Sequence, residues 1–338
     1  MKQRFPMFKL SLMIGVCAMI TSSLYAQDIH FTQWTNATQT YNPALTGEFQ
    51  QNVKGTLLHK RQWRSIGEGY TTNGLDAQYK MLSWYNDNYA GFGLNVLQDR
   101  AGIAEMRTFS IMGSAAQHLI ANRKNLLSAG AQVGFVQRSV DIDGLRWDAQ
   151  FNGVAYDPSL DDKEKLLTTK DGNLDIGCGI NWRHKGRKRF ALGYAILHTS
   201  QQITYYPRGS DKLRLRQTWH GSLWKDYEFF SVRYDALVQR QGGAMEIVTG
   251  ITFDSKLGLD SRYTTNQTSN SVKGGIFWRY RDCLHPFIGF EFRHFAAATI
   301  GFDVRTRKIP TATSFVGGPE ISLIYLGSFE RRRMKLMK

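Results

Sequence analysis

The chain has 338 residues, a formal net charge of +15, and 42% hydrophobic against 21% charged residues. This length suits one large all-β domain and exceeds that of a small binding module. Beyond the first 26 residues no stretch offers 18 consecutive apolar side chains, so no transmembrane helix is expected in the remainder of the sequence.

The first 26 residues differ from the rest. Three basic side chains precede an apolar run over 10–20, and small and polar residues then lead to Ala26. This order predicts a secretory signal peptide over 1–26, cleaved after Ala26. A membrane anchor is the alternative, but the apolar run is shorter than the roughly 20 residues that a spanning helix needs.

Export limits the partners of such a basic chain. Nucleic acid is not expected, and an anionic surface such as lipopolysaccharide or an acidic protein fits the charge better. Cys178 and Cys283 remain after removal of the signal, and their local settings favour free thiols over a disulfide. No Cys-x-x-Cys spacing is present, so we expect no metal and no cofactor.

Alternation with period two dominates the remaining sequence. In 126–138, apolar residues occupy the odd positions from Leu127 to Phe135, with Ser128 and Gln132 between them. The same pattern recurs through most of the chain and predicts strands, and no window shows a convincing 3.6-residue stripe.

The predicted strands are long, at about 9–14 residues, where strands of soluble proteins most often have about 5–6. A tilted strand needs about 9–11 residues to cross a bilayer. The alternate face carries many charged residues: Asp175, Arg183, Arg214, Arg216, Arg233, Asp235, Glu246, Lys273, Arg279, Glu291, Arg293, Asp303 and Arg305. In an outer-membrane barrel the apolar face meets lipid and the charged face lines the lumen.

Aromatic residues gather near the predicted strand ends, as in the girdles of membrane barrels. They are Trp84, Tyr85, Trp182, Tyr205, Tyr206, Trp219, Trp224, Trp278 and Tyr280. The last strand finishes on Phe329, which resembles the signal that such barrels present to their assembly machinery.

The fold expected is all-β, a single transmembrane antiparallel β-barrel of about 14 strands over 53–329. The strands begin near residues 53, 74, 89, 105, 126, 173, 190, 213, 229, 245, 272, 286, 296 and 318, and an even number closes the barrel without an exposed edge. Residues 27–52 form a periplasmic lead-in or barrel-mouth segment. Residues 330–338 form a basic tail, a solvated end or else a contact for a periplasmic partner.

The predicted barrel carries no recognisable catalytic motif. There is no Gly-x-Ser-x-Gly, no His-Glu-x-x-His and no phosphate-binding loop, so no enzyme is expected. His118, His220 and His294 fall on strands and are interpreted as wall or lumen residues. Asp141 and Asp143 begin a calcium-loop pattern that is not completed, which favours a structured outer loop.

Two stretches near the start and two further along carry a family resemblance. The opening contains Tyr-Asn-Pro-Ala at 41–44 and then Arg-Gln-Trp at 61–63; "LRWDAQFNG" follows at 145–153 and "EISLIY" at 320–325. The chain resembles the PorP/SprF-like membrane proteins of the type IX secretion system. It departs from their pattern at Leu45-Thr46, where Tyr-Ala is usual, and at the extra Ala149.

The matching positions are candidate family markers or partner-docking residues. They are Tyr41, Asn42, Pro43, Gly47, Arg61, Gln62, Trp63, Trp147 and Gln150. The resemblance implies no catalytic residue among them.

The resemblance implies a non-enzymatic outer-membrane barrel of Bacteroidetes-type Gram-negative bacteria. It would support export and surface attachment of specific cargo, a gliding adhesin or a protein with a long C-terminal sorting domain. Its partners would be that cargo, periplasmic type IX components, and outer-membrane lipid and lipopolysaccharide. The alternatives from the residues themselves are an outer-membrane porin or solute channel and, less well supported, a barrel lipase.

The stretch from Tyr41 to Gly47 also has a local interpretation. Pro43 keeps Asn42 out of the helical region, and Gly47 permits a positive φ. We expect a fixed, non-helical lead-in at or inside the barrel mouth. It is either a plug-like structural cap or a partner-docking element, with Trp63 in the outer girdle at the far end of the first strand.

Overall fold

The structure is a computed structural model. It describes residues 28–62, 69–82, 88–102, 106–140, 147–157, 159–160, 169–186, 188–201, 203–206, 209–227, 229–257, 270–293, 295–306 and 316–328. The predicted signal peptide, Trp63, Asp141, Asp143, His294, Phe329 and the basic tail lie outside these ranges.

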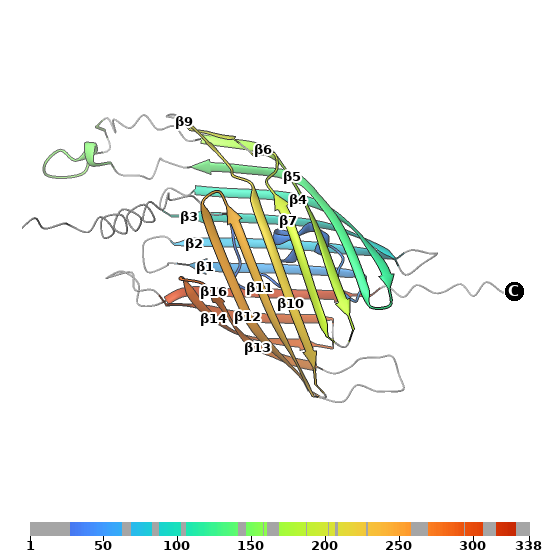
Figure 1. Ribbon diagram of the computed structural model, residues 1–338. Helices are drawn as coiled ribbons and strands as arrows, with labels where there is room; N and C mark the ends of the chain where they lie inside the picture. Colours follow the sequence, from blue (N-terminus) through green and yellow to red (C-terminus); the bar gives the residue numbers. More distant parts are fainter. Residues whose placement is uncertain are drawn as a thin grey trace, which may run out of the picture.

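Within the described residues, fourteen antiparallel strands form a closed barrel (Figure 1). They are β1 (Val53–Gln62), β2 (Tyr70–Leu82), β3 (Tyr89–Ala101), β4 (Met106–Asn122), β5 (Asn125–Val140), β6 (Thr169–Lys185), β7 (Arg189–Leu197), β10 (Arg216–Asp226), β11 (Phe230–Gln241), β12 (Ala244–Leu257), β13 (Asn270–Arg279), β14 (Cys283–Phe292), β15 (Ala296–Arg305) and β16 (Val316–Gly327). The predicted barrel is confirmed, and each strand begins within four residues of its predicted start.

The barrel closes between the first and last strands. β1 pairs with β16 in a continuous register from Val53 opposite Gly327 to Lys60 opposite Glu320. Every other strand pairs with its sequence neighbours, β7 being followed by β10. Closure leaves no unpaired sheet edge, as the hydrocarbon layer requires.

Side chains alternate between lipid and lumen, as the period-two pattern predicts. On β5, Leu127 and Val133 are 46% and 52% exposed on the outer face. Ser128 and Gln132, between them in sequence, are buried inside. The apolar face is outside and the polar face inside, the reverse of a soluble barrel and the arrangement of a membrane barrel.

The connection between β7 and β10 contains a hairpin of β8 (Ile203–Tyr206) and β9 (Gly209–Lys212). Two expectations need correction. Trp224 does not join an outer girdle, because it lies on the lumen side of β10 with the Arg183 guanidinium 5.2 Å from its ring. The lead-in is partly helical, with α2 (Thr38–Tyr41) and the 3₁₀ helix η1 (Pro43–Leu45).

Cys178 and Cys283 are free, as predicted: Cys178 is exposed on the outer wall and Cys283 is buried. None of the helices in the described part of the chain is long and apolar enough to cross a membrane.

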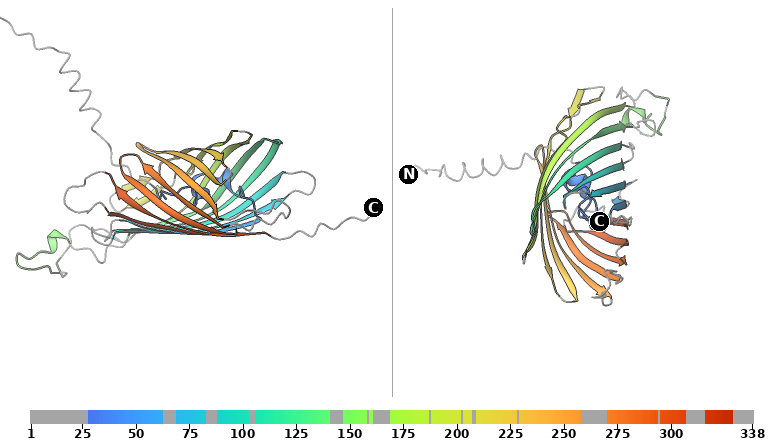
Figure 2. Two further views of the ribbon diagram at one scale, coloured as in Figure 1. Left: turned by 90° about the horizontal axis from the view of Figure 1, so that it is seen from below. Right: turned by 90° about the vertical axis from the view of Figure 1, so that its right-hand side faces the viewer.

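The barrel has two mouths. At the termini mouth β1 begins and β16 ends; at the long-loop mouth β1 ends and β16 begins. The connections after Val140 and after Leu197, which are among the longest, lie at the long-loop mouth, whereas the long connection after Leu257 lies at the other. Figures 1 and 2 show the dark blue N-terminal segment inside the barrel wall.

Candidate functional site

Residues 28–52, here called the plug, fill the lumen. The first described residue, Asp28, donates its backbone N–H to the Gln241 side chain at the long-loop mouth, at 3.1 Å. At the other end, the Asn52 backbone N–H donates to the Gly327 carbonyl at 2.9 Å, at the termini mouth. The segment predicted to lie at or inside a mouth therefore runs through the lumen from one mouth to the other.

The Asn-Pro sequence sets the turn in the middle of the plug. Asn42 is extended, and its Oδ1 accepts the Ala44 backbone N–H at 2.8 Å, so it is the N-cap of η1. Pro43 occupies the first position of η1, where its missing N–H is not needed. Gly47 has φ +81°, a conformation that side chains with a Cβ rarely adopt.

An apolar cluster holds the first half of the plug against the wall. Phe31, Trp34 and Tyr41 are almost fully buried, and wall residues from several strands complete the cluster: Leu58, Leu97, Leu237, Val248 and Phe277. The Tyr41 hydroxyl donates to the Phe31 carbonyl at 2.9 Å and accepts the Phe31 N–H at 2.7 Å. Tyr41 thus ties both ends of this part of the plug together.

Glycines on the wall let the plug backbone approach closely. A Cβ at Gly130 would lie 2.5 Å from the Pro43 carbonyl oxygen. At Gly91 a Cβ would overlap the Thr46 carbonyl, and at Gly179 the Asn42 side chain. At these three wall positions the plug approaches too closely for a side chain with a Cβ to fit without a shift.

Neutral hydrogen bonds complete this contact. We call the wall residues His118, His220, Gln78 and Gly130 the neutral cradle. The Asn42 amide donates to the His220 Nε2 at 2.9 Å, and Gln78 accepts the Gly47 N–H at 2.8 Å.

His118 fixes the end of the turn. Its Nε2 lies 2.7 Å from the Thr46 carbonyl, which can only accept, so this nitrogen carries the proton. Its Nδ1 then accepts from the Ser128 hydroxyl at 2.7 Å. The prediction that His118 and His220 are wall or lumen residues is confirmed.

A second set of wall residues, Lys60, Arg279, His285, Asp303 and Glu320, is called the charged anchor. Glu320 accepts the backbone N–H groups of Thr32 and Gln33 at 2.9 and 2.8 Å, one on each oxygen.

The charged anchor balances its own charges. The Lys60 ammonium lies 3.6 Å from Glu320 and 3.9 Å from Asp303, and all three side chains are 1–2% exposed. Arg279 lies 3.5 Å from Asp303, and the His285 Nδ1 lies 2.6 Å from the same carboxylate. Two carboxylates therefore face two permanent cations inside the wall.

A third contact, the outer latch, joins Asp28 to His198, Asp175 and Arg216 at the long-loop mouth. The His198 Nε2 lies 2.7 Å from Asp28 and its Nδ1 lies 2.7 Å from Asp175. Both ring nitrogens face carboxylates, so both donate and the ring is an imidazolium. Arg216 donates to Asp28 at 2.9 Å and to the Thr40 carbonyl at 2.6 Å.

The charges of the outer latch shift its pKa values. Burial alone would lower the pKa of His198, but the Asp28 carboxylate and the hydrogen bond that His198 donates to Asp175 outweigh it, and the net pKa is raised above 6.5. Burial would raise the pKa of Asp28, but His198 and Arg216 hold it well below its usual range. Each group stabilises the charged form of the other.

One ion pair lies just beyond the neutral cradle. Glu48 pairs with Arg183 at 2.6 Å and accepts from the Asn181 amide at 2.7 Å. Burial nevertheless raises the pKa of Glu48, because these partners offset only part of the desolvation.

The plug leaves little space inside the described lumen. One cavity of about 160 Å³ lies between the plug and the wall near Trp34 and Arg233, and another of about 40 Å³ lies near Gln39 and Arg138. These volumes suit a few water molecules rather than a drug-sized ligand. No group of three or more His, Cys, Asp or Glu side chains among the described residues is placed to hold a metal ion.

The sequence-predicted site residues fall in three places. Tyr41, Asn42, Pro43 and Gly47 lie together in the plug. Gln62, at the end of β1, donates to Asp303 at 2.8 Å.

The other candidates lie elsewhere. Arg61 is exposed on the outer wall. Trp147 and Gln150 belong to a loop with η2 (Asp148–Gln150), where Gln150 accepts the Trp147 N–H at 3.2 Å. Gln150 also donates to the Leu160 carbonyl at 3.3 Å. The candidates therefore do not form one site.

Sequence reasoning missed the residues that hold the plug by charge. Asp303 and Arg279 were assigned to the lumen face, but nothing local distinguishes them from other lumen charges. Glu320, Lys60 and Asp28 were not singled out for this role. The available signal was the excess of lumen charge itself, which an open water-filled pore would explain equally well.

Together these features define a membrane β-barrel whose lumen is closed by its own N-terminal segment. A sequence profile for the type IX secretion system membrane protein PorP/SprF matches residues 23–325. The chain therefore belongs to the PorP/SprF family. Membership implies association with components of that secretion system.

Comparisons with other proteins add little. A search of the curated proteins gives no significant match. Among solved structures, the Ralstonia pickettii toluene transporter TbuX is 12% identical with a TM-score of 0.47, over 87% of this chain and 94% of that one. A Pseudomonas aeruginosa FadL homologue is 12% identical with a TM-score of 0.47, over 91% and 96%. The P. putida toluene transporter TodX is 10% identical with a TM-score of 0.44, over 86% and 93%. We draw no function from likenesses this remote.

Proposed function

We propose that this protein is a non-enzymatic outer-membrane β-barrel of the type IX secretion system. It supports export and surface attachment of specific cargo, either a gliding adhesin or a protein with a long C-terminal sorting domain. Family membership and the membrane-barrel architecture support this proposal. Its partners are that cargo and other components of the secretion system, and its surroundings are the lipid and lipopolysaccharide of a Gram-negative outer membrane.

The long-loop mouth faces outward in this proposal. Outer-membrane barrels have short periplasmic turns, longer extracellular loops and both chain ends in the periplasm. The barrel itself begins and ends at the termini mouth, as Val53 and Gly327 show. The loop that carries Trp147 and Gln150 then lies on the outer surface, where it is available to exported cargo.

The observation that carries the proposal is the plug. A porin needs a water-filled lumen, whereas this lumen holds a segment fixed by buried charges and by backbone contacts that only glycine allows. A barrel that does not conduct by itself suits an accessory component whose partner performs the transport.

The plug residues Tyr41, Asn42, Pro43 and Gly47 are proposed as structural, because each one shapes or anchors the turn. Partner docking by the same stretch is the alternative. A Pro43→Ala protein that fails to assemble supports the structural role. One that assembles normally yet does not support surface display supports docking.

Deletion of the gene tests the function directly. We expect loss of one or a few specific proteins from the cell surface or medium, measured by comparing surface and secreted proteomes, with recovery on complementation. Unchanged proteomes would contradict the proposal. A neighbouring gene for a very large, repetitive secreted protein would indicate the cargo.

Conductance separates the proposal from the porin alternative. Purified full-length protein in planar bilayers is expected to show no steady open channel. A stable conductance of porin size in the intact protein, together with normal secretion in the deletion strain, would favour the porin.

A further inference from the structure

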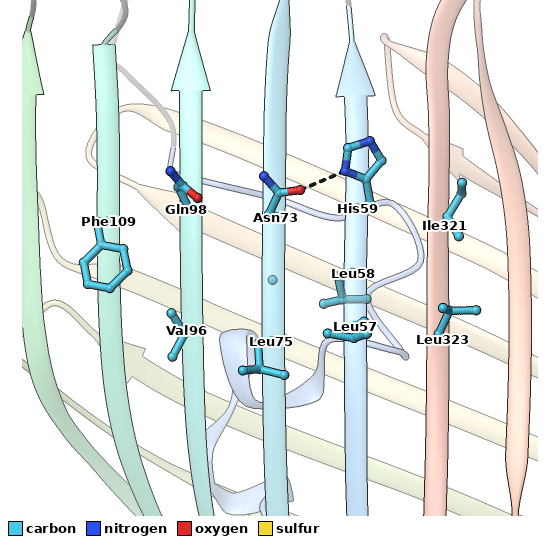
Figure 3. Close-up of a pocket in the computed structure, with 11 residues that line it drawn as sticks. Leu57, Leu58, His59, Asn73, Leu75, Val96, Gln98, Phe109, Ile321 and Leu323 are labelled. Atoms are coloured by element: carbon cyan, nitrogen blue, oxygen red, sulfur yellow. Dashed lines mark hydrogen bonds between the residues drawn. The ribbon is translucent and has the colours of Figure 1, made fainter.

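A groove of about 390 Å³ lies on the outer wall, over β1, β2, β3 and β16 near the long-loop mouth (Figure 3). Its central lining is polar toward that mouth and apolar away from it. Strand registers place the outward-facing lining residues in two rows across the wall. A third row, outside the groove itself, lies two residues further toward the mouth.

The first row is apolar. Leu57 pairs with Leu323 on one side and with Leu75 on the other, and Leu75 pairs with Val96. Leu57 is 53% exposed, and Figure 3 shows Leu57, Leu75 and Leu323 side by side on the wall. This row continues the lipid-facing surface of the barrel.

The centre of the second row is polar although it lies on the lipid-facing side, and the apolar Ile321 and Phe109 flank it. His59 pairs with Asn73, and Asn73 pairs with Gln98. The His59 ring and the Asn73 carbonyl are hydrogen-bonded at 2.8 Å (Figure 3). Amide and imidazole groups at this depth suit the ester, amide and hydroxyl groups that join acyl chains to a lipid headgroup.

The third row is cationic. Arg61 pairs with Thr71, Thr71 with Arg100, and Arg100 with Arg107, all on the outer face. The three arginines are exposed. Each guanidinium group can donate two parallel hydrogen bonds to a phosphate, and a row of three on one face suits a ligand with more than one anionic group.

The spacing places this row at headgroup level. Met81 and Thr71 lie on the same face at the two ends of β2. Ten residues at about 3.3 Å each give roughly 33 Å of strand, or about 25 Å of depth at a tilt of about 40°, which equals the height of the apolar band of such barrels. The polar row then lies at the edge of the hydrocarbon and the arginine row just outside it.

The neighbouring wall over β13, β14 and β15 is apolar at the same mouth. There Trp278 pairs with Leu284, and Leu284 pairs with Val304, all on the outer face. These residues are 36–43% exposed and all are apolar. The arginine row therefore does not continue onto β13, β14 and β15.

We propose that this wall binds a phosphorylated glycolipid of the outer leaflet. Its phosphates lie against Arg61, Arg100 and Arg107, its linkage groups against the second row, and an acyl chain in the groove below. Across three inter-strand steps of about 4.8 Å the arginines span roughly 14 Å, which fits a headgroup with two phosphates better than a single phosphodiester. The inference rests on the proposed outward orientation of the long-loop mouth.

A binding assay with the full-length protein in detergent tests this inference. The probes are bisphosphorylated lipid A, the same lipid A after removal of both phosphates, and phosphatidylglycerol, with retained lipid measured by native mass spectrometry. We expect bisphosphorylated lipid A to bind about tenfold more tightly than either other lipid, and the preference to fall as salt rises.

The Arg100→Gln/Arg107→Gln double variant is expected to lose this preference. Arg240→Gln is the matched control, because Arg240 is exposed at the same mouth on β11, away from the groove. Heat-modifiable migration in gels confirms that both variants fold. Equal binding of all three lipids, equal binding of phosphatidylglycerol and lipid A, or the same loss in the control would overturn the inference.

Failure here and failure of the proposed function are separable. If the wild-type protein does not discriminate among the three lipids but the deletion strain has altered proteomes, only the lipid site is contradicted. If the protein does discriminate but the deletion strain has unchanged proteomes, only the secretion role is contradicted.

Discussion

The charged anchor and the neutral cradle hold the same plug by different chemistry. Glu320 binds two backbone N–H groups with a full negative charge, balanced by Lys60 inside the wall. The neutral cradle binds through uncharged histidines and through the absence of a Cβ at Gly130. The first contact depends on every partner remaining present and charged, whereas the second depends on backbone shape.

This difference predicts where the plug can be released. Buried ion pairs are costly when one partner is lost, because the other charge then stays buried without compensation. Steric fit does not respond to protons or salt. We therefore expect the long-loop end of the plug to detach from the wall more readily, while the Asn42–Gly47 turn stays bound.

The largest effect is expected from Glu320→Ala. This change leaves two plug N–H groups without their acceptor and removes one of the two carboxylates near Lys60, and should cost about 3–5 kcal/mol of unfolding free energy. Denaturant unfolding in detergent measures it, and planar bilayers should show new conductance. Asp254→Ala is the control, since its pair with Lys273 at 3.5 Å is partly exposed and should change stability by less than about 1 kcal/mol. If both variants lose the same unfolding free energy, Glu320 contributes no more to stability than a partly exposed ion pair.

The neutral cradle is tested by Gly130→Ala. The added Cβ meets the Pro43 carbonyl at 2.5 Å, and overpacking of this kind costs about 1–3 kcal/mol. At Gly113 a Cβ would meet only the Val133 carbonyl, at 3.7 Å, so Gly113→Ala is a matched control. Unfolding of both variants in the same detergent gives the comparison. An unchanged free energy of unfolding for Gly130→Ala would show that the plug is not closely packed against β5 at this position.

A smaller loss is expected from Asn42→Ala. The variant removes the cap of η1 and the hydrogen bonds that Asn42 donates to the Ile180 carbonyl and to His220. We expect it to lower the free energy of unfolding by about 1–2 kcal/mol. Hydrogen exchange should become faster at Ala44 and Leu45 while Thr32 and Gln33 stay protected. Faster exchange at both ends would mean that the two contacts are not independent.

The smallest effect is expected from pH at the outer latch. The raised pKa of His198 contributes stability that is complete below about 6.5 and is lost as pH rises through its higher value in the docked state. The lowered pKa of Asp28 contributes stability that is present above about 3.8 and is lost as pH falls. Docking of the Asp28 end is therefore strongest between these values.

Hydrogen exchange at pH 5.5 and 8.5, corrected for intrinsic rates, measures the latch. Exchange around Ile29 and His30 should be faster at the higher pH, and exchange at Thr46 and Gly47 should not change. His198→Gln should abolish the pH difference. If the pH dependence of exchange persists in His198→Gln, another titrating group causes it.

The barrel was predictable because its signal is local. Each strand alternates on its own, as in the odd-numbered apolar residues from Leu127 to Phe135, and fourteen such strands require only closure. Which face of the wall an individual side chain occupies was predicted less well. Trp224 was assigned to an outer girdle by its position near a strand end, although its even number places it on the lumen face with His220 and Ser222.

The plug was not predictable in the same way. Local rules correctly indicated a turn at Asn42-Pro43 and a positive φ at Gly47, but missed α2, which has only four residues and whose packing comes from the wall. The partners of Thr32 and Gln33 lie 288 and 287 residues away on β16. No short-range pattern encodes such a pair, so the sequence indicated a lead-in without its path through the lumen.

The position of Glu320 also constrains the order in which the molecule is assembled. It lies on the last strand, and the same strand pairs with β1 to complete the wall. The plug precedes every strand in the chain, and its Thr32 and Gln33 amides have no Glu320 acceptor until the final strand is made. Seam formation and plug anchoring are therefore one event, and a chain truncated before β16 would lose both together.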